Sequence, residues 1–107
     1  MPNVYTNAKV DLTTTNATVL YTAPAATMSL VKSILVSEDT GNADTITVTI
    51  TDEDAAVFSL FKVTAVAANT SVELLTSPLV VKENEILKVT AATANRLHVV
   101  SSILEIS

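Results

Sequence analysis

The clearest pattern in the sequence is a strict alternation over residues 45–51, which read TITVTIT. Every second residue is a threonine, and the residues between them are Ile46, Val48 and Ile50. A period of two places the two sets on opposite faces of a β-strand, and β-branched residues suit a pleated, half-buried surface. The pattern therefore predicts a strand with one face in a core and the other face outside it.

Similar alternation recurs along the chain, and turn-forming residues separate the segments that carry it. No window has a helical period, and short strands at intervals of about 8 to 12 residues are typical of a sandwich or jelly roll. We predict an all-β protein, an antiparallel β-sandwich or jelly roll of about seven or eight short strands. The expected strands are residues 18–22, 28–37, 45–51, 56–63, 71–75, 79–81, 86–91 and 97–106, with an edge strand at 3–10 as a further candidate.

The segment between strands 28–37 and 45–51 contains Asp39, Asn42 and the only glycine of the chain, Gly41. Such a segment is typical of a β-hairpin, so we expect these two strands to pair. The second strand has no charge and no proline, and as an exposed edge it would invite strand addition. It should therefore be central in its sheet or covered by another chain.

The chain of 107 residues has no internal repeat or linker, which predicts a single sandwich domain over residues 1–107. Residues 1–15 are a candidate extended segment of that domain. With no cysteine, neither a disulfide framework nor a thiolate metal site is expected.

The charge balance restricts the class of partner. The formal net charge is -5 and only six residues are Lys or Arg, so no basic stripe is available to neutralise phosphates. No uninterrupted apolar run exceeds four residues, whereas a membrane span needs about 18. We expect neither a nucleic acid nor a membrane as partner.

Two clusters of acidic residues, within 38–44 and at 52–54, lie at the ends of the uncharged strand. At about 3.3 Å per residue the strand separates them by roughly 20 Å, so they cannot share one ion. Neither cluster has the spacing of an EF-hand loop. Solvated turns are the favoured interpretation, and a metal site built from one cluster and another loop, such as Glu83 and Glu85, stays an alternative.

Catalytic signatures are absent from the sequence. His98 is the only histidine, and no G-x-S-x-G, glycine-rich phosphate loop or H-x-x-x-H accompanies it. We expect no enzyme, no cofactor, no catalytic or metal-binding residue and no small-molecule substrate, although a pair of carboxylates brought together from two strands stays open. With no Trp, only Tyr5 and Tyr21 are candidates for stacking on a sugar.

The apolar content exceeds what one small interior needs. Hydrophobic residues make up 49% of the chain, and the strands LHVVSSILEI and SILVS carry them on both faces. We therefore expect part of this surface to form contacts between subunits, in part by strand pairing with another chain. The candidate contact residues are Val4, Tyr5, Thr45, Thr47, Thr49 and Thr51.

Three stretches carry a family resemblance: TVLYTAPAATMSLVKSILVSEDTGNADTITVTI at 18–50, SPLVVKENEILKVTA at 77–91 and LHVVSSILEI at 97–106. Together they resemble small β-sandwich virion proteins of tailed bacteriophages. Many of those chains have Gly-Asp at the acidic turn where this one has Asn84-Glu85, and asparagine tolerates the left-handed conformation that such a turn can require.

The resemblance implies a virion component that is assembled in the cytoplasm of a bacterial host. Within this class it favours a head decoration, or cement, protein. Such a protein would be a homotrimer that binds the major capsid protein, and its effective affinity would be raised by several simultaneous contacts. A neck or tail-associated phage protein and a fibre-type carbohydrate-binding module are the alternatives.

Overall fold

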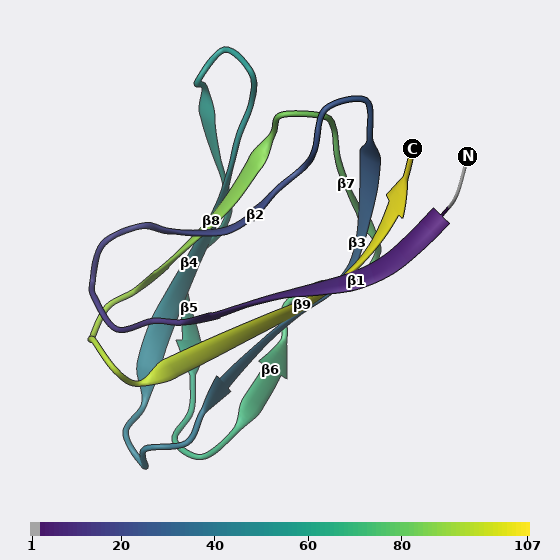
Figure 1. Cartoon of the computed structure of the whole chain (residues 1–107). Helices are drawn as coiled ribbons and strands as arrows, with labels where there is room; N and C mark the ends of the chain where they lie inside the picture. The colour runs from purple at the N-terminus through teal and green to yellow at the C-terminus, as the bar shows by residue number, and fades with distance from the viewer. Residues whose placement is uncertain (1–2) are drawn as a thin grey trace.

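The computed structural model describes residues 3–107, which form nine strands in two sheets packed face to face (Figure 1). The expected antiparallel β-sandwich is confirmed. There are nine strands in the described chain, one more than predicted. The candidate edge strand near the N-terminus pairs with β9, and the short segment 79–81 pairs with β3. The strands are β1 (Asn3–Asp11), β2 (Thr18–Thr22), β3 (Met28–Glu38), β4 (Asp44–Thr51), β5 (Val57–Val66), β6 (Ser71–Glu73), β7 (Leu79–Val81), β8 (Ile86–Ala91) and β9 (Leu97–Ile106).

Sheet A has the order β1-β9-β3-β6, and sheet B has the order β2-β8-β4-β5. In sheet A the long strand β3 pairs with two short strands on the same edge: β7 lies opposite residues 29–31 and β6 opposite residues 35–37. All pairs are antiparallel. In the part of the chain that is described, no helix is long and apolar enough to cross a membrane.

The core lies between the sheets and follows the alternation in the sequence. On β4, Ile46 and Val48 are fully buried, whereas the threonines beside them are partly exposed. Each fully buried aliphatic side chain of this kind stabilises the fold by about 1.5–3 kcal/mol. The buried hydrophobic residues are Leu12, Leu20, Ala23, Val31, Ile34, Val36, Ile46, Val48, Val66, Leu74, Val81, Leu87, Val89, Ala91, Leu97, Val99 and Ile103.

The prediction that β3 and β4 form a hairpin is wrong. β3 belongs to sheet A and β4 to sheet B, so residues 39–43 cross from one sheet to the other. Gly41, with a φ of 83°, provides the turn that was expected there. The turn leads to the opposite layer because β9 pairs with β3 over most of its length, while β8 and β5 occupy the two edges of β4.

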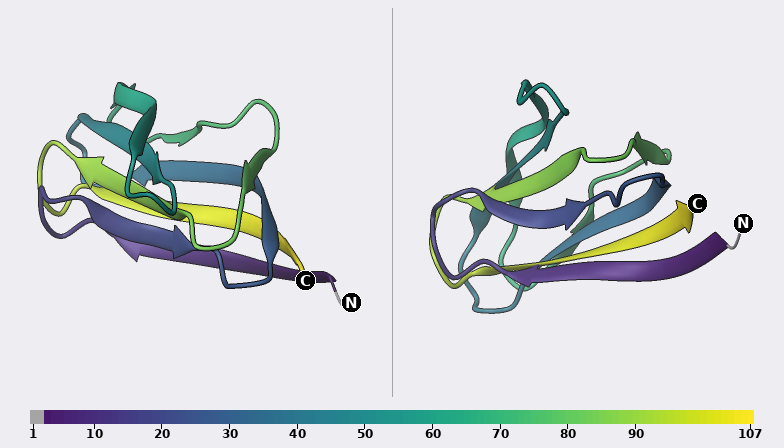
Figure 2. Two further views of the ribbon diagram at one scale, coloured as in Figure 1. Left: turned by 90° about the horizontal axis from the view of Figure 1, so that it is seen from above. Right: turned by 45° about the horizontal axis from the view of Figure 1, so that its top comes forward.

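β4 forms its hairpin with β5 instead, and this hairpin extends beyond the rest of the sandwich, at the top of Figure 1 (see also Figure 2). The carboxylate of Asp52 closes its turn by accepting hydrogen bonds from the backbone N–H groups of Asp54 and Ala56, both at 2.9 Å. β5 is the edge strand of sheet B, and its register with β4 is interrupted twice. Such bulges limit the pairing of an edge with other chains.

β1 pairs with β9 over its whole length, from Asn3 opposite Ile106 to Asp11 opposite His98. The start of β1 and the end of β9 therefore lie side by side, as Figure 2 shows. β1 is the edge strand of sheet A, and its outer edge is not paired within the described residues.

Candidate interaction surface

The outer face of sheet A carries a row of apolar side chains that crosses four strands. Tyr5 of β1 lies opposite Leu104 of β9. Leu104 in turn lies opposite Leu30 of β3, which lies opposite Val80 of β7. Residues directly opposite one another project to the same face of a sheet, and the residues that alternate with these along β3 and β9 are largely buried. The row therefore points away from the core.

Two further apolar pairs flank this row: Met28 with Ile106, and Leu35 with Val100 beyond a pair of serines. Tyr5 is 73% exposed and Met28 48%. Together these side chains form a patch of exposed and half-buried apolar residues on one face of the sheet. We call this surface the sheet A face; its apolar residues are Tyr5, Met28, Leu30, Leu35, Val80, Val100, Leu104 and Ile106.

The sheet A face also carries charged side chains, among them two lysines. Lys32 lies at a register shift in β3, and its Nζ is 5.7 Å from the centre of the Tyr5 ring, within the range of a cation–π interaction. Lys9 of β1 lies opposite Val100 and projects to the same face. Asp11, opposite His98, and Glu73, opposite Leu35, project to this face as well. The face therefore combines apolar area with charges of both signs.

The predicted contact residues of the N-terminal segment lie on the free edge of sheet A. Tyr5 belongs to the sheet A face, whereas Val4 is opposite Glu105 on the other side of β1 and is 47% exposed. The first five residues of β1 are all exposed. The structure thus brings an unpaired backbone edge and an apolar face together at this strand.

The four predicted contact threonines lie on β4, which is central in sheet B. Thr45, Thr47, Thr49 and Thr51 alternate with the buried residues and project from the outer face of that sheet. Both edges of β4 are bonded, to β5 and to β8. The backbone of this strand therefore has no edge left for pairing with another chain. Of the threonine hydroxyls on the outer face, that of Thr51 is buried. One of them, Thr47, accepts a hydrogen bond from the N–H of Val63 at 3.0 Å.

The acidic cluster within 38–44 is a solvated turn only in part: Asp39 is exposed, whereas the carboxylates at its two ends are buried, which corrects the sequence-based interpretation for these two. Glu38 and Asp44 are 2% and 8% exposed. The Glu38 carboxylate accepts hydrogen bonds from the backbone N–H groups of Thr40, Gly41, Asn42 and Asn69, at 2.8–3.1 Å. Both carboxylates therefore hold the crossover between the sheets in place.

Asp44 works in a similar way at the start of β4. Its two carboxylate oxygens accept hydrogen bonds from the N–H groups of Thr45 and Thr93, at 2.8 and 3.1 Å. The second of these ties the crossover to the turn between β8 and β9. Both oxygens of this carboxylate are thus engaged in holding the chain.

The second acidic cluster, at 52–54, does meet the turn that carries Glu83 and Glu85, and the two turns line a common hollow. The side-chain amide of Asn84 donates to Glu53 Oε1 at 3.3 Å. However, no three or more Asp, Glu or His side chains of residues 3–107 are grouped so that they could hold a metal ion. The arrangement is a largely acidic end of the molecule, formed by the hairpin tip and the β7–β8 turn, and Lys82 also lines the hollow.

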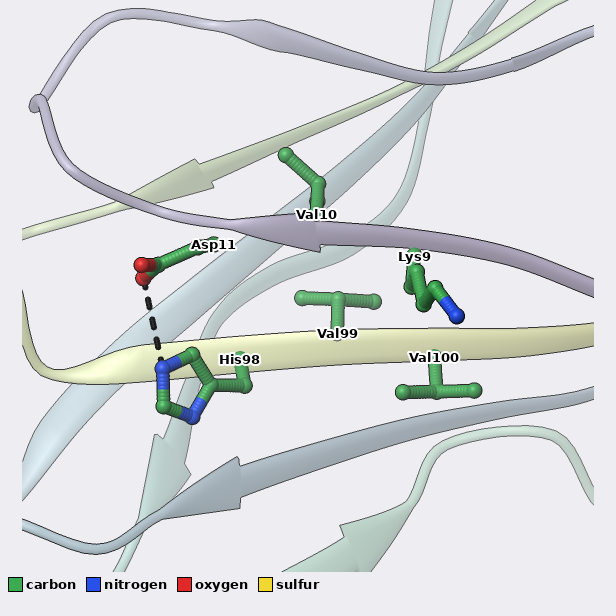
Figure 3. Close-up of a pocket in the computed structure, with 6 residues that line it drawn as sticks. All are labelled: Lys9, Val10, Asp11, His98, Val99 and Val100. Carbon is green, nitrogen blue, oxygen red and sulfur yellow. Dashed lines mark ion pairs between the residues drawn. The ribbon is translucent and has the colours of Figure 1, made fainter.

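His98 lines a shallow hollow with Asp11 and the side of β1 (Figure 3). Its Nε2 is 3.3 Å from Asp11 Oδ1, and its Nδ1 is 3.9 Å from Asp39 Oδ2. The other residues of the hollow are Lys9, Val10, Val99 and Val100, so no serine or threonine hydroxyl lies in its lining. This geometry pairs an exposed imidazole with carboxylates at the end of the sheet A face.

A polar cluster inside the sandwich connects the two sheets. Tyr21 of β2 donates its hydroxyl to Glu105 Oε2 at 2.5 Å and lies 2.7 Å from Ser29 Oγ. Burial raises the pKa of Tyr21 to about 12, and the hydrogen bond to Glu105 acts in the same direction. Tyr21 therefore links the sheets and is committed to internal hydrogen bonds.

The residues of the sheet A face other than Tyr5 were not among the predicted contact residues. The signal for them was present, because two strands carry apolar residues on both faces, and β3 and β9 are these strands. Sequence alone did not show which of the two faces would be outside.

No protein-family model matches this chain, and no curated protein sequence matches it. Among solved structures, a chain in the structure of infectious bursal disease virus Gt strain matches with a TM-score of 0.47 and 10% sequence identity. That match covers 98% of this chain, which spans about 30% of the viral chain.

Proposed function

We propose that this protein is a structural component of a tailed-bacteriophage virion, and specifically a head decoration protein that binds the major capsid protein as a homotrimer. The observation that carries the proposal is the sheet A face, an apolar surface that lies outside the buried core of a small sandwich. The resemblance of residues 18–50, 77–91 and 97–106 to phage virion proteins gives the class. The place of action is then the virion, and assembly occurs in the cytoplasm of the bacterial host.

In the proposed mechanism, the copies of the trimer bind equivalent sites of the capsid lattice at the same time. An interface of modest size binds weakly on its own, but three copies held together bind a repeating surface with a much higher effective affinity. The free edge of β1 adds backbone donors and acceptors beside the apolar area. Bridging neighbouring capsomers in this way would stabilise the head against rupture.

We also propose that the chain is not an enzyme and uses no cofactor. What supports this is the setting of His98, which sits on an open surface with Asp11 and Asp39 as its ionic neighbours. The buried carboxylates of Glu38 and Asp44 are occupied by backbone N–H groups. These two carboxylates are held in structural hydrogen bonds, and no serine or threonine hydroxyl lines the hollow beside His98.

The test is co-sedimentation of the purified protein with empty phage heads that lack it. We expect saturable binding by the wild-type chain and a loss of at least about tenfold in affinity for a Tyr5→Asp, Met28→Asp double variant. Val19→Asp is the matched control, because Val19 is also half-exposed but lies on sheet B. Binding to purified necks or tails in place of heads, or saturable glycan binding without head binding, would overturn the decoration role.

A further inference from the structure

We infer that a bulge in β5 blocks strand addition at the β5 edge of sheet B, so that copies of this protein do not associate by continuing that sheet from one molecule to the next. We call this feature the β5 bulge; it consists of Lys62 and Val63. The inference goes beyond the proposed function, because it concerns a contact that the fold prevents and does not depend on the partner that the protein binds.

The sequence of β5 is typical of a strand that pairs readily with other chains. Its ten residues, VFSLFKVTAV, include no proline and one charged residue, Lys62. Val57, Phe58 and Val63 are 62%, 55% and 61% exposed, and within residues 3–107 the outer edge of β5 has no partner strand. A regular edge strand of this composition invites aggregation edge to edge. The fold therefore needs a feature that keeps this edge from pairing.

The register between β4 and β5 shows that the strand is not regular. Thr64 lies opposite Ile46 and Phe61 lies opposite Val48, so the two residues between them on β5 face only Thr47 on β4. Two residues opposite one define a β-bulge, which bends the strand and increases its twist. An added strand needs a regular series of donors and acceptors along the edge, and the β5 bulge interrupts that series.

A second register shift, at Leu60, divides β5 further. Regular pairing with β4 is confined to residues 57–59 and 64–66, three residues at each end. Segments that build edge-to-edge assemblies are about six or seven residues long. Neither regular part of β5 is long enough to supply such a segment.

The packing on either side imposes the β5 bulge on the chain. Val63 has a φ of 51°, a left-handed conformation that a β-branched residue rarely adopts by itself. Phe61 packs against the core and Val66 is fully buried, which fixes the chain at both ends of the segment between them. The N–H of Val63 donates to Thr47 Oγ1 at 3.0 Å, so β4 holds this donor and it is not offered to another chain.

The other edge strands put the β5 bulge in context. The β2 edge of sheet B is five residues long, and its register with β8 shifts between Val19 and Tyr21. In sheet A, by contrast, β1 pairs with β9 over nine residues without a shift. Both edges of sheet B are thus interrupted, whereas sheet A keeps one regular edge. Because a fibre continues a sheet through both of its edges, sheet B cannot propagate from copy to copy.

Deletion of Lys62 tests the inference, because it leaves one residue, Val63, to face Thr47 and makes β5 regular from Phe61 to Val66. We expect the deletion variant to fold and to aggregate at least about tenfold faster than wild type, as followed by light scattering and by the fluorescence of an amyloid-binding dye. Lys62→Ala is the matched control. It removes the same charge but keeps the chain length and the bulge, so it should aggregate at the wild-type rate.

A folded deletion variant that aggregates no faster than wild type would overturn the inference. A Lys62→Ala variant that aggregates as fast as the deletion variant would overturn it as well, because the charge and not the bulge would then protect the edge. Circular dichroism shows whether the deletion variant is folded.

If the deletion variant is unfolded, Thr47→Val decides the question. It removes the acceptor that holds Val63 without changing the chain length, and we expect aggregation to be at least about threefold faster. Thr49→Val makes the same change opposite Ser59, on the same face of β4, and should leave the rate unchanged. Equal rates for these two variants would contradict the inference. None of these measurements uses phage heads, so the inference and the proposed function fail separately.

Discussion

At the scale of single residues, the Glu38 carboxylate shows how a charged group organises this fold. It is nearly inaccessible to solvent, and four backbone N–H groups and the Thr40 hydroxyl donate to it. Burial acts to raise its pKa, but the hydrogen bonds from Thr40, Asn69 and Asn42 outweigh that effect and lower the pKa to about 2. The ionised form is therefore part of the folded state.

The lowered pKa predicts a dependence of stability on acid. Because the folded-state pKa lies below the ordinary value of 4.5, the contribution of Glu38 is fully present above about pH 4.5 and is lost as the pH falls toward 2. Urea denaturation should show Glu38→Gln to be clearly less stable than wild type at pH 7, with the difference shrinking between pH 4.5 and 2. A difference that stays constant over this range would contradict the assignment.

A second residue-scale prediction concerns Val63, whose φ of 51° lies in the left-handed region. A β-branched side chain is strained there, and Val63 is 61% exposed, so little packing compensates. Val63→Asn should raise the free energy of unfolding by about 1 kcal/mol and the melting temperature by roughly 4–8 °C. The same change at Val19, a half-exposed strand residue outside the positive-φ set, should bring no gain. Equal changes in the free energy of unfolding at the two sites would show that the backbone at Val63 is not strained.

At the scale of elements, the sequence identified nearly all strands but not their partners. The alternation of Thr and Ile or Val identified β4, because side-chain period is a local property. The pairing of β3 with β4 was mispredicted because turn residues such as Gly41 fix a change of direction, not the layer to which the chain proceeds. That choice depends on β8 and β9, which lie about 40 to 60 residues further along the chain.

The two faces of β4 predict different responses to truncation. Val48→Ala removes a fully buried side chain and should cost about 2 kcal/mol, whereas Thr49→Ala, on the outer face, should cost less than about 1 kcal/mol. Urea denaturation of the two variants measures the contrast. Equal losses would mean that the outer face of sheet B is packed as tightly as the core.

At the scale of the whole molecule, the excess of apolar residues led us to expect apolar surface outside the core, and the structure places part of it on the sheet A face. Tyr5 was predicted as a contact residue from its place near the N-terminus. Its neighbours Leu30, Val80 and Leu104 come from three other strands and become one row only through the registers of β1, β9, β3 and β7. Since register is set by the whole sheet, no local pattern could assemble this row.

The central claim is that the outward surface of this sandwich stabilises a phage head by binding it. The temperature at which heads release their DNA, followed with a DNA-binding dye, tests this claim most directly. Wild-type protein added to heads that lack it should raise that temperature, and the Tyr5→Asp, Met28→Asp variant should raise it much less. Heads that rupture at the same temperature with and without saturating wild-type protein would contradict the account.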